Sequence, residues 1–102
     1  MPTQPSSAHK NRITASKELT IINKLGLHAR AASKLAQLCQ QFSAKITLSL
    51  EDKEADAAST MALMLLAGGR GKVVKVTAEG ADAPEALQAI SQLISDKFDE
   101  EE

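Results

Sequence analysis

The sequence predicts an α/β fold of the α+β type, an open-faced sandwich with helices on one face of a four-stranded antiparallel sheet. Three segments alternate apolar and polar residues, which is the pattern of strands with one buried face and one wet face. Two longer segments repeat apolar residues every three or four positions, which is typical of amphipathic helices. Because each strand keeps a wet face, we expect the helices to cover only the other face.

The first part of the chain predicts a strand, a turn and a helix. Leu19 and Ile21 alternate with polar neighbours and indicate a strand, and residues 23–26 have the sequence of a turn. A helix is predicted from about Ala29 to Gln41, because apolar residues there step by four, three and four along one face. These residues are Ala31, Leu35, Leu38 and Phe42.

The middle of the chain predicts two strands and a short helix. Residues 44–50 alternate strictly and indicate a strand, residues 51–53 form a polar turn, and residues 54–58 are expected to return as a short strand. Ser59 is placed to cap a short helix that runs to about Leu66, where a pair of glycines ends it.

The last part predicts a strand and a long helix. Residues 74–78 alternate again, and Asp82-Ala83-Pro84-Glu85 resembles a capping box with proline in the first turn. The helix that follows is expected to end near Lys97. The resulting order is β-α-β-β-α-β-α, whose first six elements also occur in ferredoxin-like folds, so the pattern alone leaves both topologies open.

The chain is expected to hold one domain, over residues 16–98, between two polar ends. Residues 1–15 are predicted to be a flexible N-terminal extension, since their first part is rich in proline and serine and shows no periodicity. Residues 99–102 are predicted to be a solvated acidic tail. Without Trp or Tyr, and with two Phe, the core must be largely aliphatic, which argues against an enclosed pocket for a large ligand.

Composition excludes several classes of function. The formal net charge is -1 and the basic residues are scattered, which argues against a nucleic-acid-binding face. Cys39 is the only cysteine, so no internal disulfide can form, and we expect a reducing, cytoplasmic location. No apolar run approaches the roughly 20 residues that cross a bilayer. No Cys/His cluster has metal-ligand spacing. We therefore expect a protein, monomeric in solution, without metal, cofactor or membrane insertion.

His28 is the leading candidate for chemistry, because it falls where a loop becomes the first helix. The first N–H groups of a helix lack intrahelical partners and favour phosphate, and the helix dipole there disfavours an imidazolium. Arg30, in the first turn, is misplaced for helix stability but suited to meet a dianion. The alternative is that His28 is a helix-capping residue beside an ordinary surface arginine.

Two segments carry a family resemblance. Asn23-Lys24-Leu25-Gly26-Leu27-His28-Ala29-Arg30 resembles the active-site segment of HPr, the histidine-containing phosphocarrier family of bacterial phosphotransferase systems. Ser59-Thr60-Met61-Ala62-Leu63-Met64-Leu65-Leu66 resembles the second signature of that family at the expected separation. The resemblance covers roughly residues 16–98 and implies the HPr sandwich, with four antiparallel strands and three helices.

The resemblance implies that His28 accepts a phosphoryl group on Nδ1 from enzyme I and passes it to an enzyme IIA domain. Arg30 would neutralise the phosphate, and the backbone amides of Ala29 and Arg30 would help to bind it. The protein would be a carrier within the system rather than an independent enzyme. Many relatives have proline after the arginine, whereas this chain has Ala31, the best helix former.

In the second signature, both Ser59 and the apolar helix that follows it can be interpreted in two ways, one functional and one purely structural. Ser59 matches a serine that a kinase phosphorylates in some members of the family, but the favoured interpretation is a plain N-cap, worth about 1 kcal/mol. Residues 61–66 are apolar almost all round, so one side of this helix is expected to stay exposed. The resemblance implies a docking surface formed by Thr60, Met61 and Met64; the alternative is that this side packs under a loop.

Two rival functions remain beside phosphotransfer. One is a regulatory protein-binding module of the same fold, which would use the Met-rich face alone. The other is a ferredoxin-like ligand-sensing domain, in which the match over residues 25–30 would be a coincidence. Within the family, the sequence does not separate the sugar-transport branch from the nitrogen-regulatory branch.

Overall fold

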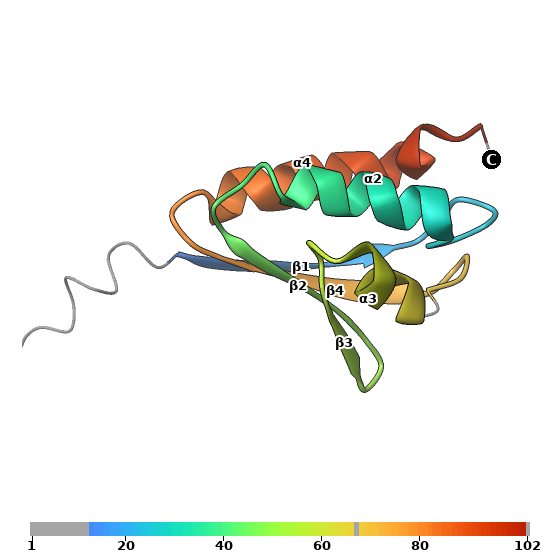
Figure 1. Cartoon of the computed structure of the whole chain (residues 1–102), viewed down its shortest axis with the longest axis horizontal. Helices are drawn as coiled ribbons and strands as arrows, with labels where there is room; N and C mark the ends of the chain where they lie inside the picture. The colour runs from blue at the N-terminus through green and yellow to red at the C-terminus, as the bar shows by residue number, and fades with distance from the viewer. Residues whose placement is uncertain (1–12, 67, 102) are drawn as a thin grey trace, which may run out of the picture.

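The computed structural model describes residues 13–66 and 68–101, and its elements follow one another in the predicted order (Figure 1). The strands are β1 (Thr14–Thr20), β2 (Lys45–Leu50), β3 (Lys53–Asp56) and β4 (Val73–Glu79). The helices are α2 (Ala29–Cys39), α3 (Thr60–Leu65) and α4 (Ala83–Ser95), and a short turn, Lys97–Asp99, follows α4.

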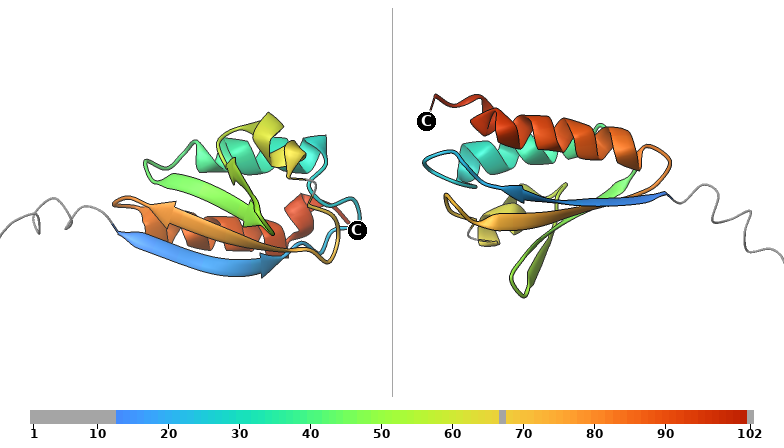
Figure 2. Two further views of the ribbon diagram at one scale, coloured as in Figure 1. Left: turned by 90° about the horizontal axis from the view of Figure 1, so that it is seen from below. Right: turned by 180° about the vertical axis from the view of Figure 1, so that it is seen from behind.

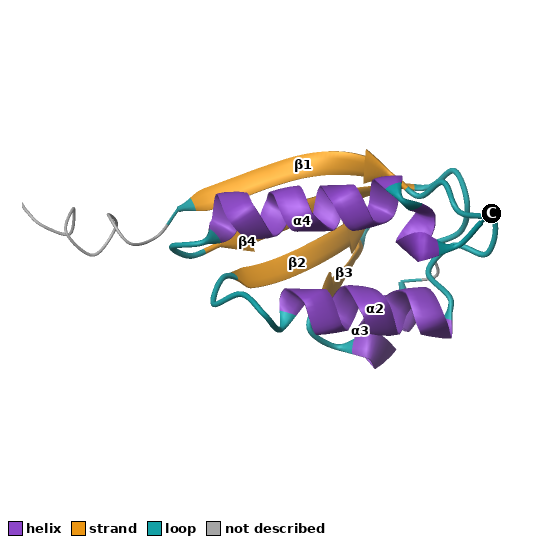
Figure 3. Cartoon of the chain, turned by 90° about the horizontal axis from the view of Figure 1, so that it is seen from above, coloured by secondary structure: helices purple, strands orange, loops and turns teal. Residues whose placement is uncertain are grey.

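Within the described residues the strands form one sheet in the order β1-β4-β2-β3, and all neighbours are antiparallel. The register places Leu48 of β2 opposite Val76 of β4 and opposite Ala55 of β3. Helices α2 and α4 lie side by side over one face of the sheet, and α3 packs against α2 and β3 (Figures 2 and 3). The predicted open-faced sandwich is therefore confirmed.

The core lies between the sheet and the two long helices. In β2 and β4 alternate residues are buried, as predicted for strands with one buried face and one solvent-exposed face. Each fully buried Val, Leu or Ile contributes about 1.5–3 kcal/mol of hydrophobic stabilisation. Helix α2 adds small residues to this core, and the largest buried side chain is the aromatic ring of Phe98, beyond the end of α4. The buried residues of the two strands are Ile46, Leu48, Leu50, Val74, Val76 and Ala78.

The first strand differs from its predicted position. It begins at Thr14, so residues 14 and 15 belong to the sheet rather than to the predicted extension, whose residues 1–12 lie outside the described part of the chain. It ends at Thr20, and Ile21 is a buried residue beyond it that pairs by backbone hydrogen bonds with Gly71 and Lys72. The limits of β1 were hard to predict because it is an edge strand with mostly exposed residues, which leave little alternation of apolar and polar residues in the sequence.

The predicted capping box at the start of α4 is wrong in its hydrogen bonds. Asp82 is the N-cap residue, but its backbone has φ -104° and ψ 24° instead of the extended geometry that aims a side chain at its own helix. Its carboxylate accepts hydrogen bonds from Ser43 N (2.9 Å) and Ala44 N (2.8 Å). The bond from the Ser43 amide is the main cause that lowers the pKa of Asp82 below its ordinary value.

Candidate functional site

His28 is the N-cap residue of α2, with extended backbone angles of φ -75° and ψ 179°. Its carbonyl accepts the first helical hydrogen bond, from Ala32 N at 2.8 Å, but its side chain makes no capping hydrogen bond. The interpretation of His28 as a helix-capping side chain is therefore wrong. The ring is free for other contacts, beside the first amides of the helix, those of Ala29 and Arg30, which lack intrahelical partners.

A tight loop before α2 fixes where His28 lies. Gly26 has φ +65°, and a Cβ there would be 2.4 Å from the carbonyl oxygen of Gly68, so this position requires glycine. Leu27 N donates a hydrogen bond of 2.8 Å to the same oxygen. These contacts join the loop to the segment that follows α3, and they bring the beginning of α2 next to the end of α3.

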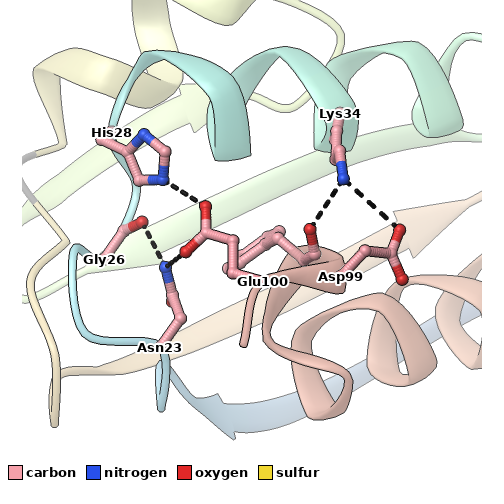
Figure 4. A network of polar contacts seen from close by, with 7 residues as sticks. Asn23, Gly26, His28, Lys34, Asp99 and Glu100 are labelled. Atoms are coloured by element: carbon pink, nitrogen blue, oxygen red, sulfur yellow. Dashed lines mark hydrogen bonds and ion pairs between the residues drawn. The ribbon is translucent and has the colours of Figure 1, made fainter. Parts of the chain in front are cut away.

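The imidazole ring contacts a carboxylate from the other end of the chain. Nε2 of His28 forms a hydrogen bond and ion pair with Oε2 of Glu100 (Figure 4). The second oxygen, Oε1, accepts a 3.0 Å hydrogen bond from Nδ2 of Asn23, which also donates to Gly26 O at 2.9 Å. Asn23 is fully buried, so the carboxylate rests on a rigid donor. Nδ1 of the ring faces away from Glu100.

Glu100 is ionised in this position. Burial acts to raise its pKa, but the hydrogen bonds from Asn23 and His28 and the charge of the nearby Arg30 outweigh that effect. The pKa of Glu100 therefore lies below its ordinary value. At neutral pH the carboxylate is an acceptor only, so a neutral His28 ring that bonds to it must carry its proton on Nε2.

The segment after α4, residues 97–100, contacts α2 and brings Glu100 to the histidine. Its residues 97–99 have positive φ angles of 55–65°, a left-handed turn that is unfavourable for residues other than glycine. The buried ring of Phe98 supports this turn, and Lys34 of α2 donates to the Phe98 carbonyl at 2.9 Å. Lys34 also pairs with Asp99 at 3.6 Å (Figure 4).

The predicted solvated acidic tail is thus wrong for Glu100, whose side chain is only 14% exposed, whereas Asp99 and Glu101 are exposed. Residue 102 lies outside the described part. Asn23 and Glu100 are the two residues that the sequence analysis missed as parts of the site. Asn23 belonged to a recognised motif, but Glu100 is 72 residues from His28 and had no local signal.

The site is a shallow depression of about 560 Å³ on the surface. It brings together the predicted His28, Ala29 and Arg30 with Glu100, and Lys24 and Leu25 complete its lining. The His28 side chain is 26% exposed and Arg30 is exposed. Such an open depression suits a group presented by another macromolecule better than an enclosed small ligand.

Helix α3 exposes an apolar face. Met61 and Leu65 are each 73% exposed and Met64 is also exposed, so this side does not pack under a loop. Thr60 is half-buried and lines the same surface depression as these three residues. Thr60, Met61 and Met64 were predicted from the resemblance to form this surface, and Leu65 is an additional member of it. Ser59 accepts a 3.1 Å hydrogen bond from Ala62 N, which confirms the predicted N-cap.

Other candidates for chemistry are weak. Cys39 is buried, and desolvation, with a smaller effect of Asp56, raises its pKa to about 12, so the thiol stays protonated. Among residues 13–66 and 68–101, no three His, Cys, Asp or Glu side chains are grouped to hold a metal ion. In the same residues, no helix has both the length and the apolarity to span a membrane.

Fold and site together define a class: a small open-faced sandwich that presents one partly exposed histidine at a helix start, beside an arginine and an apolar helix. The family described as "PTS HPr component phosphorylation site" matches residues 15–96. The chain is 50% identical over 84 residues to "Phosphocarrier protein NPr" of Shewanella violacea, a match covering 82% of this chain and 92% of that protein. It is 46% identical to "Phosphocarrier protein HPr" of Xylella fastidiosa, covering 82% and 94%.

A solved structure agrees. HPr from Thermoanaerobacter tengcongensis superposes with a TM-score of 0.83 at 41% identity, covering 86% of this chain and 99% of that one. The chain belongs to the HPr family, the phosphocarriers of the phosphotransferase system, as its two motifs predicted.

Proposed function

We propose that this phosphocarrier accepts a phosphoryl group on Nδ1 of His28 from the phosphohistidine of enzyme I and passes it to an enzyme IIA domain in the cytoplasm. The observation that carries the proposal is the geometry of the ring. Its Nε2 is engaged by an ionised carboxylate, which directs the lone pair to Nδ1, on the side facing away from Glu100.

The transfer divides covalent catalysis between proteins, with histidine as the nucleophile. Nδ1 attacks the phosphorus of the donor, a new N–P bond forms, and the N–P bond of the donor breaks with its electrons returning to the donor ring. Arg30 and the amides of Ala29 and Arg30 then bind the dianion. An exposed site with one arginine stabilises the phosphohistidine weakly, which suits an intermediate that must be passed on.

The exposed side of α3, with Thr60, Met61 and Met64, is the proposed docking surface for both partners. Methionine adapts to different partner surfaces because its side chain is flexible and polarisable. The contact from Leu27 to Gly68 joins the end of this helix to the loop that carries His28, so a protein docked on α3 would lie near the ring.

The proposal is tested by incubation with enzyme I and phosphoenolpyruvate, followed by mass analysis and acid treatment. We expect one acid-labile phosphate on the wild type and on His9→Ala, the variant of the other histidine, and none on His28→Ala. Absence of phosphate on the wild type, or full labelling of His28→Ala, would contradict the proposal. The mass data also report any phosphate on Ser59 after treatment with a cell extract, and that phosphate would be stable to acid.

The enzyme IIA domain that accepts the phosphate decides whether the protein belongs to the sugar-transport or the nitrogen-regulatory branch of the phosphotransferase system. The relatives carry the names NPr and HPr at 50% and 46% identity, so similarity does not separate the two. Offering the phosphorylated protein to enzyme IIA domains of the sugar and nitrogen branches, and comparing the transfer rates, assigns the branch. If neither domain accepts the phosphate, the regulatory module acting through the α3 surface becomes the better hypothesis.

A further inference from the structure

We propose that Glu100 makes the phosphorylation of His28 regiospecific, because its carboxylate covers Nε2 and leaves Nδ1 as the nucleophilic nitrogen of the ring. The inference rests on the proposed function for its biological meaning, but the contact itself is independent of any partner. Glu100 acts through His28 and is therefore a positioning residue.

The carboxylate is held on both sides. One oxygen contacts Nε2 of His28, and the other accepts a hydrogen bond from the buried Asn23 amide at 3.0 Å. Asn23 is itself fixed by its second bond, to Gly26 O. A surface glutamate would move freely, whereas this one has its two oxygens assigned to different donors.

The backbone that carries Glu100 is also anchored. The left-handed turn at residues 97–99 is unfavourable for residues other than glycine, yet it persists because Phe98 is fully buried and Lys34 binds the Phe98 carbonyl. The strained turn has one evident result, which is to return the chain to α2 and to deliver Glu100 to the imidazole.

The consequence for the reaction follows from the proton on Nε2. When Nδ1 forms its bond to phosphorus, the Nε2 proton stays in place and the ring becomes an imidazolium. Glu100 then faces a positive ring, and the hydrogen bond gains a charged partner. Arg30, Lys24 and the helix amides line the depression around the same ring, so Glu100 is the one carboxylate among the residues that line it.

The test uses a small chemical donor, potassium phosphoramidate, which needs no partner protein. Wild type, Glu100→Gln and Glu100→Ala are compared, and Glu101→Gln is the matched control because Glu101 is the exposed neighbour. Phosphorus and nitrogen NMR distinguish the product on Nδ1 from that on Nε2. Thermal unfolding shows that each variant is folded.

We expect the wild type and Glu101→Gln to resist phosphorylation on Nε2. Glu100→Ala should raise the share of the Nε2 product by about tenfold, roughly the effect of losing one hydrogen bond to a charged group, with Glu100→Gln in between. An unchanged product ratio in folded Glu100→Ala overturns the inference. If the ratio changes but enzyme I never labels the wild type, the proposed function fails while the role of Glu100 stands.

Discussion

At the residue scale, Glu100 and Arg30 bring charges of opposite sign into one depression beside the same imidazole ring. The carboxylate contacts Nε2, whereas Arg30 extends from the first turn of α2. A cation in that turn is unfavourable for a helix by about 0.3–1 kcal/mol. Helix stability therefore gives no reason for an arginine at this position, which supports a role in binding an anion.

We therefore predict that Arg30→Ala slows phosphotransfer without lowering the stability of the fold. Phosphorylation of His28 by enzyme I should slow by about a hundredfold, the typical effect of removing a donor that stabilises developing negative charge. The free energy of unfolding should stay within about 0.5 kcal/mol of the wild type, because the residue is exposed and alanine is the better helix former.

Stopped-flow transfer kinetics and urea unfolding measure the two effects of this substitution. Arg30→Lys is the control, since it keeps the positive charge but loses the planar pair of donors of the guanidinium group. Its transfer rate should lie between those of the wild type and Arg30→Ala. Transfer at the wild-type rate in Arg30→Ala would remove the charge role assigned to Arg30.

At the scale of elements, α3 contributes more to recognition than to the core. Of its six residues, only Leu63 is buried, and Met61, Met64 and Leu65 face solvent. Exposed apolar residues gathered on one short helix are unfavourable in isolation and usually mark an interaction surface. Its place beside the histidine loop makes it the natural contact for a protein that must reach His28.

We therefore predict that Met61→Glu lowers kcat/KM for phosphorylation by enzyme I by about tenfold or more, the effect expected for a central interface residue. Stability should change by less than about 0.5 kcal/mol, because Met61 is 73% exposed. Ile13→Glu is the matched control, because Ile13 is an exposed apolar residue directly before β1. The beginning of β1 lies at the opposite end of the molecule from the first turn of α2 (Figure 1). Equal losses in both variants would indicate a non-specific effect of charge.

The elements themselves were largely predictable from the sequence, because buried and exposed residues alternate in β2 and β4 and recur helically in α2 and α4. The predictions went wrong where a side chain serves a distant partner. Asp82 looked like a cap for its own helix but binds Ser43 and Ala44, and Glu100 looked like a solvated tail but binds His28. Local patterns contain no information about such contacts, and nothing in the sequence marks residues 97–99 as a left-handed turn.

At the scale of the whole molecule, acidic side chains tie α4 to α2 at both ends. Asp82, at the start of α4, binds two amides in the loop between α2 and β2, and Glu100, beyond the end of α4, binds His28 at the start of α2. The two helices run side by side over the sheet (Figure 3), so these contacts fix their mutual position from opposite ends. One of them is structural, whereas the other lies in the candidate site.

The contact of the Asp82 carboxylate with the Ser43 and Ala44 amides predicts how the stability of the fold depends on pH. The pKa of the Asp82 carboxyl is lower in the folded protein than in the unfolded chain. The ionised carboxylate therefore stabilises the fold fully at a pH above the unfolded-state pKa of Asp82. This stabilisation is lost as the pH falls through the folded-state pKa of Asp82. Asp82→Asn should therefore be less stable than the wild type at neutral pH, and the difference should shrink as the pH falls below the ordinary pKa of an aspartate side chain. Urea unfolding across this range measures it, and Asp52→Asn, in the exposed turn between β2 and β3, should follow the wild type. A difference that stays constant down to the lowest pH would show that the Asp82 contacts do not depend on its charge.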